Sequence, residues 1–159
     1  MKILIMSRRA IEKMAEQAFP EKTAVISIAD YGDEFATLNN APAHVLRIAF
    51  DDVDNDVIVD AVGAHGTAAE IAAVERQYHM FSGEQAETIA RFFFDVWNKT
   101  DVLICQCEHG QSRSAAVASA ILEYRSKRGI DIFADDRYYP NKVVFRRLLS
   151  ALRALTSLA

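Results

Sequence analysis

The segment from residue 102 to residue 127 constrains the fold more than any other part of the chain. It begins with an apolar run at residues 102–105, typical of a buried strand, and ends with an alanine-rich run at residues 114–127, which has few helix breakers. The link between the two runs is short and contains Gly110, which permits a tight turn. The sequence therefore predicts a strand, a tight loop and a helix in immediate succession.

This loop carries a thiol and a guanidinium, because Cys107 and Arg113 are separated by five residues. Unpaired N–H groups and a positive dipole at the amino end of a helix let such a loop surround a phosphate-sized anion. They also favour the thiolate of a cysteine, which is its nucleophilic form. The planar guanidinium can hold two oxygens of a tetrahedral anion. We predict that Cys107 is a nucleophile, that Arg113 binds the oxygens, and that Ser114 donates its hydroxyl to the sulfur.

The residues between the nucleophile and the arginine are predicted to bind the substrate anion together with Arg113. Their main-chain amides would form the cradle, whatever the direction of their side chains. These residues are Glu108, His109, Gly110, Gln111 and Ser112.

The loop resembles the signature of the cysteine-dependent protein tyrosine phosphatase superfamily, especially its small dual-specificity-like branch of bacterial type. That signature is a His-Cys pair, five residues, and then Arg followed by Ser or Thr; Cys107, Gly110, Arg113 and Ser114 match it. The resemblance implies a phosphomonoester phosphatase in which Cys107 takes the phosphoryl group as a phosphocysteine and water then releases it.

Two positions depart from the family pattern. Gln106 stands where the family has a histidine that stiffens the loop, and Glu108 adds negative charge beside an anion site unless its side chain points outward. Both departures bear on the rate of the reaction more than on its chemistry.

The resemblance also implies a proton donor, an aspartate on a loop after an upstream strand. Residues 44–50 read as such a strand and run into the acidic residues 51–56. Asp52 is the first choice, with Asp51 and Asp54 as substitutes, because crowded carboxylates near a dianion favour protonation of one of them. The alternative is a solvated acidic loop or a weak cation site. A calcium loop is disfavoured because its glycine and closing glutamate are missing.

No metal or cofactor is predicted. Cys105, Cys107 and His109 could form part of a metal site, but a fourth ligand has no recognisable spacing. The two cysteines lie too close on an extended segment for an unstrained disulfide, so both are expected as thiols.

Composition bounds the remaining questions. With 159 residues, 51% of them hydrophobic, the chain is expected to form one phosphatase-like domain over residues 1–159. Its charge of −4 argues against nucleic-acid and membrane-surface partners, which leaves a phosphorylated protein or a small phosphomonoester as the expected substrate. The sequence has no signal-peptide pattern and no long apolar run, so a cytoplasmic location is expected.

Strand-like and helix-like segments alternate along the chain. This order predicts an α/β fold, a single three-layer domain with a central, mostly parallel sheet flanked by helices, and an anion site at the carboxyl edge of a central strand. Residues 55–80, with a helix expected at 67–78, are read as a lid or substrate-facing insertion, or equally as a packing appendage. The predicted strands are residues 2–6, 23–28, 44–50 and 102–105, and the other helices are 8–18, a helix that opens at the Ser82–Gln85 capping box, 114–127, and a last helix opened by Pro140 and Asn141.

Two other functions remain open at this stage. The chain could be a catalytically weak or silent phosphate-binding module, because Gln106 and Glu108 depart from the family pattern. It could also be a related thiol enzyme, such as an arsenate reductase or a sulfurtransferase, although Cys105 lies poorly for a resolving thiol. The physiological substrate and the oligomeric state are not assigned by the sequence.

Overall fold

Four parallel strands form one sheet in the computed structural model, which describes residues 1–157. The order across the sheet is β1-β4-β2-β3, so β4, which ends at Cys107, has a parallel neighbour on each side. This arrangement confirms the parallel α/β fold and the central position of the cysteine strand. The strands are β1 (Lys2–Ser7), β2 (Thr23–Ala29), β3 (His44–Ala49) and β4 (Val102–Cys107).

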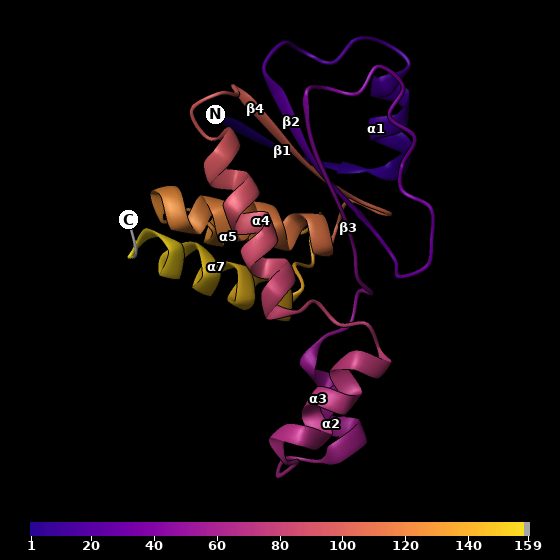
Figure 1. The fold of residues 1–159 in the computed structure, drawn as a ribbon, viewed down its shortest axis with the longest axis vertical. Coiled ribbons are helices and arrows are strands. Elements are labelled where there is room, and N and C mark those ends of the chain that lie inside the picture. Colours follow the sequence, from indigo (N-terminus) through magenta and orange to yellow (C-terminus); the bar gives the residue numbers. More distant parts are fainter. Residues whose placement is uncertain (158–159) are drawn as a thin grey trace.

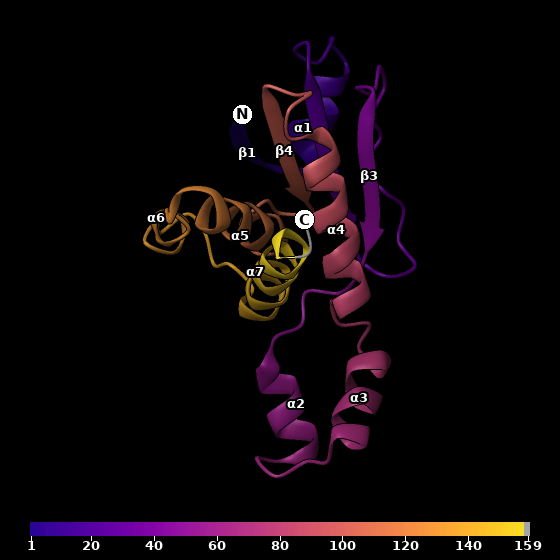
Figure 2. The same cartoon turned by 60° about the vertical axis from the view of Figure 1, so that its left-hand side comes forward.

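Helices cover both faces of the sheet (Figures 1 and 2). Alternate residues of β2 face opposite layers, because Ile26 packs with α4, α5 and α7, whereas Val25 packs with Ile11 of α1. The three-layer arrangement predicted from the sequence is therefore present. The helices are α1 (Arg8–Ala15), α2 (Asn55–Val62), α3 (Ala68–Gln77), α4 (Gly83–Val96), α5 (Arg113–Ser126), α6 (Ile130–Phe133) and α7 (Lys142–Thr156).

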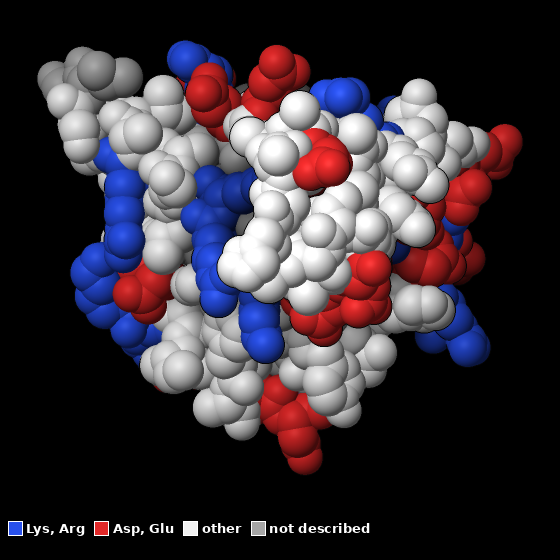
Figure 3. Space-filling view, turned by 90° about the horizontal axis from the view of Figure 1, so that it is seen from below, with Lys and Arg blue, Asp and Glu red and all other residues white. Residues whose placement is uncertain are grey.

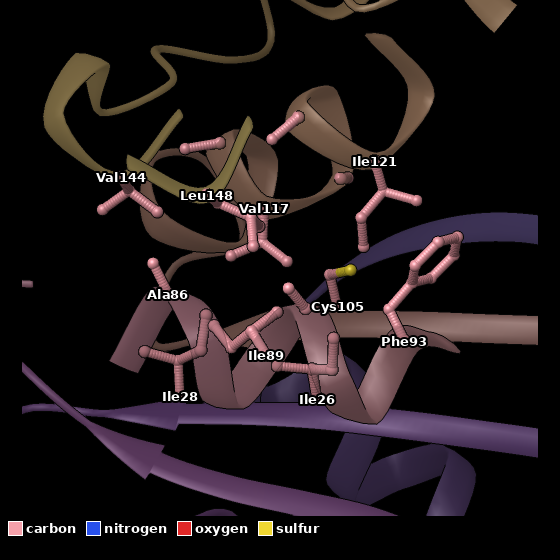
Figure 4. Packing of buried hydrophobic residues seen from close by; sticks show 14 of the residues in the cluster. Ile26, Ile28, Ala86, Ile89, Phe93, Cys105, Val117, Ile121, Val144 and Leu148 are labelled. Carbon is pink, nitrogen blue, oxygen red and sulfur yellow. The ribbon is translucent and has the colours of Figure 1, made fainter. Parts of the chain in front are cut away.

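Helix α5 is buried along most of its length. Every residue from Arg113 to Ile121 is buried, and the run contains four alanines. Small side chains let neighbouring helices approach closely, which suits a helix covered by the sheet on one side and by α7 on the other. Figure 4 shows this layer, with Val117 and Ile121 of α5 facing residues of the sheet and of α4.

Two helices were not predicted. Residues 55–62 form α2, whose β-branched run of Val57, Ile58 and Val59 has little helix propensity, but Asp54 caps it by accepting a hydrogen bond from the Asn55 N–H at 2.7 Å. Residues 130–133 form the single-turn helix α6.

Helices α2 and α3 form a hairpin (residues 55–77) that projects from the sheet and the other helices in both ribbon views (Figures 1 and 2). All residues of α2 are described and none is buried, while α3 buries only Val74. At its base, Glu75 forms an ion pair with Arg147 of α7. Seen from below, this end of the molecule is a broad area of uncharged residues with acidic groups within and around it, and Lys and Arg side chains border it on the left of the view (Figure 3).

Among residues 1–157, no helix has the length and hydrophobicity that a membrane crossing requires.

Candidate active site

The loop between β4 and α5 lies at the carboxyl end of the central strand, where β4 ends at Cys107 and α5 begins at Arg113. Gly110 has a φ of +69°, and a Cβ there would lie 2.6 Å from the backbone nitrogen of Ser7. The loop therefore presses against the junction of β1 and α1, and glycine is required both by conformation and by space. We call residues 107–113 the phosphate loop, after the anion that the sequence predicts it to bind.

The thiol lies at the base of this loop. Cys107 is 2% exposed, and its Sγ lies 3.0 Å from the Ser114 Oγ, which is itself buried in the first turn of α5. This is the contact that the sequence predicted for the pair. A hydroxyl at this distance can donate a hydrogen bond to a thiolate, which stabilises the charged sulfur.

Arg113 points into the protein, with a side chain 5% exposed. Its Nη1 donates to the Asp30 Oδ1 and to the Phe50 carbonyl oxygen, both at 2.8 Å. Its Nε is buried and has no hydrogen-bond partner among residues 1–157. An unpaired buried guanidinium N–H is costly, so this donor fits an anion bound in the loop.

Asp30 was missed by the sequence reading. It is the first residue after β2, which neighbours β4 in the sheet, so the topology brings it to the phosphate loop. A lone aspartate after a strand belongs to no motif, and only the strand order could have pointed to it.

The three candidate acids differ in what they contact. Asp52 accepts a hydrogen bond from the Ser112 hydroxyl at 2.8 Å. This bond joins the phosphate loop to the segment after β3 that carries the three acids, which we call the acid loop. Asp51 accepts from the Tyr31 N–H and pairs with His79, while Asp54 caps α2. Of the three, Asp52 is the one whose side chain reaches the phosphate loop, which supports its choice as proton donor.

Asn141 holds the acid loop from the other side. Its Nδ2 donates to the Asp52 Oδ1 and to the Val53 carbonyl oxygen, both at 3.0 Å, while its Oδ1 caps α7 at the Val144 N–H. The sequence predicted Asn141 only as a helix start. Its second contact is non-local and could not be read from the chain.

The other residues of the loop either bond to groups outside it or are exposed. Glu108 forms an ion pair with Arg8 at 3.2 Å, and its carbonyl oxygen accepts from the Arg8 N–H. The charge of Glu108 is thus compensated outside the loop. His109 and Gln111 are exposed, and the Gln111 carbonyl oxygen accepts from the Tyr139 N–H at 2.9 Å.

Gln106 is buried beneath the loop and does not reach it. Its Oε1 accepts a hydrogen bond from the Ser27 hydroxyl at 2.7 Å. This buried bond joins β4 to β2, so Gln106 stiffens the sheet rather than the loop.

Cys105 is fully buried between the sheet and the helices, where Figure 4 shows it with Ile26 and Ile121. Desolvation raises the pKa of its thiol well above the ordinary value, with a smaller contribution from Cys107. Cys105 therefore stays a neutral core thiol. Within residues 1–157, no three His, Cys, Asp or Glu side chains are grouped so that they could hold a metal ion.

Comparison with known proteins rests on structure alone. No protein-family model matches the chain, and no curated protein matches it. Solved structures of three phosphatases do match. Human DUSP28 is 16% identical, with a TM-score of 0.54, over 99% of this chain and 95% of that chain. PTPMT1 in complex with PI(5)P is 12% identical, with a TM-score of 0.54, over 99% of this chain and 94% of that chain. Tk-PTP in the active form is 17% identical, with a TM-score of 0.53, over 97% of this chain and 92% of that chain. The chain thus has, over nearly its full length, the fold of the cysteine-dependent dual-specificity phosphatase superfamily that its phosphate loop predicted.

Proposed function

We propose that this protein is a phosphomonoester phosphatase that works through a phosphocysteine intermediate. The observation that carries the proposal is the phosphate loop itself: a buried thiol with the Ser114 hydroxyl 3.0 Å from its sulfur, and an arginine whose buried Nε has no partner among residues 1–157. A nucleophile, a hydroxyl donor and an unsatisfied guanidinium donor at the start of one helix suit attack on a bound phosphate.

In the first step the Cys107 thiolate attacks phosphorus and the bond from phosphorus to the ester oxygen breaks. The electron pair of that bond leaves with the oxygen, which takes a proton from Asp52. Asp52 suits this role because Ser112 and Asn141 both donate to its Oδ1, at 2.8 and 3.0 Å, and so hold it beside the loop.

In the second step a water molecule attacks phosphorus and gives a proton to Asp52, and the bond from phosphorus to sulfur breaks. The sulfur leaves as a thiolate, which the Ser114 hydroxyl stabilises by donating to it. The Arg113 Nε and the loop amides bind the phosphoryl oxygens in both steps.

The nature of the substrate is proposed at the level of a phosphomonoester. Cys107 is 2% exposed, so the reacting phosphate must enter the cradle itself while the rest of the substrate stays at the surface. Phosphotyrosine in a protein meets this requirement. The match to PTPMT1 in complex with PI(5)P adds a phosphorylated lipid headgroup as a substrate to assay.

The decisive test is hydrolysis of an aryl phosphate by the wild type and by Cys107→Ser, which should lose measurable turnover because its hydroxyl is a much weaker nucleophile at neutral pH. Cys105→Ala is the matched control, since it removes the neighbouring thiol and should retain activity. Turnover that survives Cys107→Ser, or a wild type with no turnover and no trapped phosphoenzyme, would overturn the proposal.

A silent phosphate-binding module is the second candidate, favoured by Gln106, which bonds Ser27 and does not support the loop. Calorimetry with vanadate beside the activity assay separates the two functions. Binding without turnover would assign the chain to the silent class.

A further inference from the structure

Asp30 lies at the site although no motif includes it. Resting on the proposed function, we propose that Asp30 is a positioning residue: its carboxylate holds Nη1 of Arg113 so that Nε faces the phosphate. The residue itself does not touch the substrate in this role. It acts through the arginine.

The geometry of Arg113 carries this inference. Asp30 and the Phe50 carbonyl oxygen both accept from Nη1 at 2.8 Å, and they follow β2 and β3, two neighbouring strands. A guanidinium is rigid and planar, so fixing one terminal nitrogen on two acceptors also restricts the direction of Nε. The Nε is left as the buried donor without a partner among residues 1–157.

The residues that follow Asp30 along the chain, up to Glu34, are hydrogen-bonded to the site at two points. The Tyr31 N–H donates to the Asp51 Oδ1 at 2.8 Å, which joins the segment to the acid loop. Arg8 donates to the Glu34 carbonyl oxygen at 2.6 Å and pairs with Glu108 of the phosphate loop. Asp30 is therefore held from both sides, as a positioning group requires.

A positioning role and a purely electrostatic role of Asp30 predict opposite effects of its removal on phosphate binding. A carboxylate near the cradle repels a phosphate dianion, so removing it would strengthen phosphate binding if charge were its only contribution. Removing a positioning group instead weakens both binding and turnover. Asp33 is the matched control, because it lies on the same segment, is exposed, and makes no side-chain hydrogen bond or ion pair among residues 1–157.

A role as proton donor is also distinguishable. Loss of a proton donor slows poor leaving groups more than good ones, whereas a misplaced arginine slows all of them alike.

The test uses the full chain and a series of aryl phosphates with leaving groups of increasing acidity. We expect Asp30→Ala to lower kcat/KM by about 10- to 100-fold, equally across the series and without moving the limbs of the pH profile. Asp30→Asn, which keeps an oxygen acceptor, should recover part of the loss, and Asp33→Ala should stay within about twofold of wild type. A loss that grows with the pKa of the leaving group would overturn the positioning role.

A second readout does not depend on turnover: protection of the Cys107 thiol from alkylation by inorganic phosphate. The wild type and Asp33→Ala should be protected at the same phosphate concentration, and Asp30→Ala should need about tenfold more. Equal or tighter protection in Asp30→Ala would overturn this inference and leave the proposed function standing. A wild type that phosphate does not protect would overturn the proposed function, and this inference with it.

Discussion

Helix α5 and the hairpin of α2 and α3 differ in how many of their residues are buried. Every residue of α5 from Arg113 to Ile121 is buried, whereas α2, described in full, buries none. The phosphate loop leads directly into α5, and the acid loop leads into the hairpin. The candidate site thus adjoins a helix whose first nine residues are all buried, while the hairpin beside it buries few of its side chains.

The largest difference is expected from large-to-small substitutions in the two regions. Leu148 of α7 is fully buried against α5, so Leu148→Ala should lower the free energy of unfolding by about 3–5 kcal/mol. Val59 of α2 is 53% exposed, and Val59→Ala should change the free energy of unfolding by less than about 0.5 kcal/mol. Urea unfolding measures both. Equal losses would show that the hairpin belongs to the same cooperative unit as the core.

Two glycines with similar backbone angles sharpen the comparison. Gly110 and Gly63 have φ values of +69° and +72°, but a Cβ at Gly110 would meet the Ser7 backbone at 2.6 Å, and one at Gly63 would meet nothing within 4 Å. Gly110→Ala should cost about 2–4 kcal/mol of global stability and abolish phosphate protection of the thiol. Gly63→Ala adds backbone strain only and should leave the site intact. Loss of protection in both variants would contradict this account.

At alkaline pH the buried region should respond through Cys105. Burial raises the pKa of the Cys105 thiol, so the folded state keeps it protonated while the unfolded chain ionises above the ordinary value of 9.0. The stabilisation is complete below that value and is lost as pH rises, by about 1.4 kcal/mol at one unit above it. Urea unfolding on both sides of that pH measures the slope, which should be shallower in Cys105→Ala. An unchanged slope would contradict the assignment.

At acid pH the smallest effect should appear, confined to the hairpin. The Thr67 N–H and hydroxyl donate to Glu70, which lowers the pKa of that exposed carboxyl from its ordinary value of 4.5. The contribution of this cap is present above 4.5 and is lost as pH falls through the lowered value. The protection factors of the α3 amides, which correct for the slower intrinsic exchange at low pH, should fall there in the wild type, and those of Glu70→Gln should depend less on pH. A fall in the protection factors of α4 as well would show that the effect is not local.

Local signals predicted much of this structure. The capping box of Ser82 and Gln85 is present, and each predicted strand lies within the observed one or differs from it by one or two residues at its end. The sequence of strand, glycine-containing loop and alanine-rich helix led directly to the contact of Cys107 with Ser114, because both residues lie within eight consecutive positions. Patterns of this kind can be recognised since each depends on neighbours along the chain.

The missed features depend on contacts between distant segments. Asp30 reaches Arg113 only because β2 lies beside β4, and Asn141 reaches Asp52 from the start of the last helix. Helix α2 was missed for a different reason. Its β-branched residues favour a strand, and its cap at Asp54 was read as part of an acidic loop.

The strand order has a consequence for synthesis on the ribosome. Within residues 1–157, strand β1 pairs only with β4, which emerges about a hundred residues later. The first strand of the nascent chain therefore has no partner while β2 and β3 can already associate. The strand that ends at Cys107 is thus also the one that joins the two halves of the sheet. A truncated chain that ends before residue 102 would expose two strand edges to aggregation and would lack both cysteines.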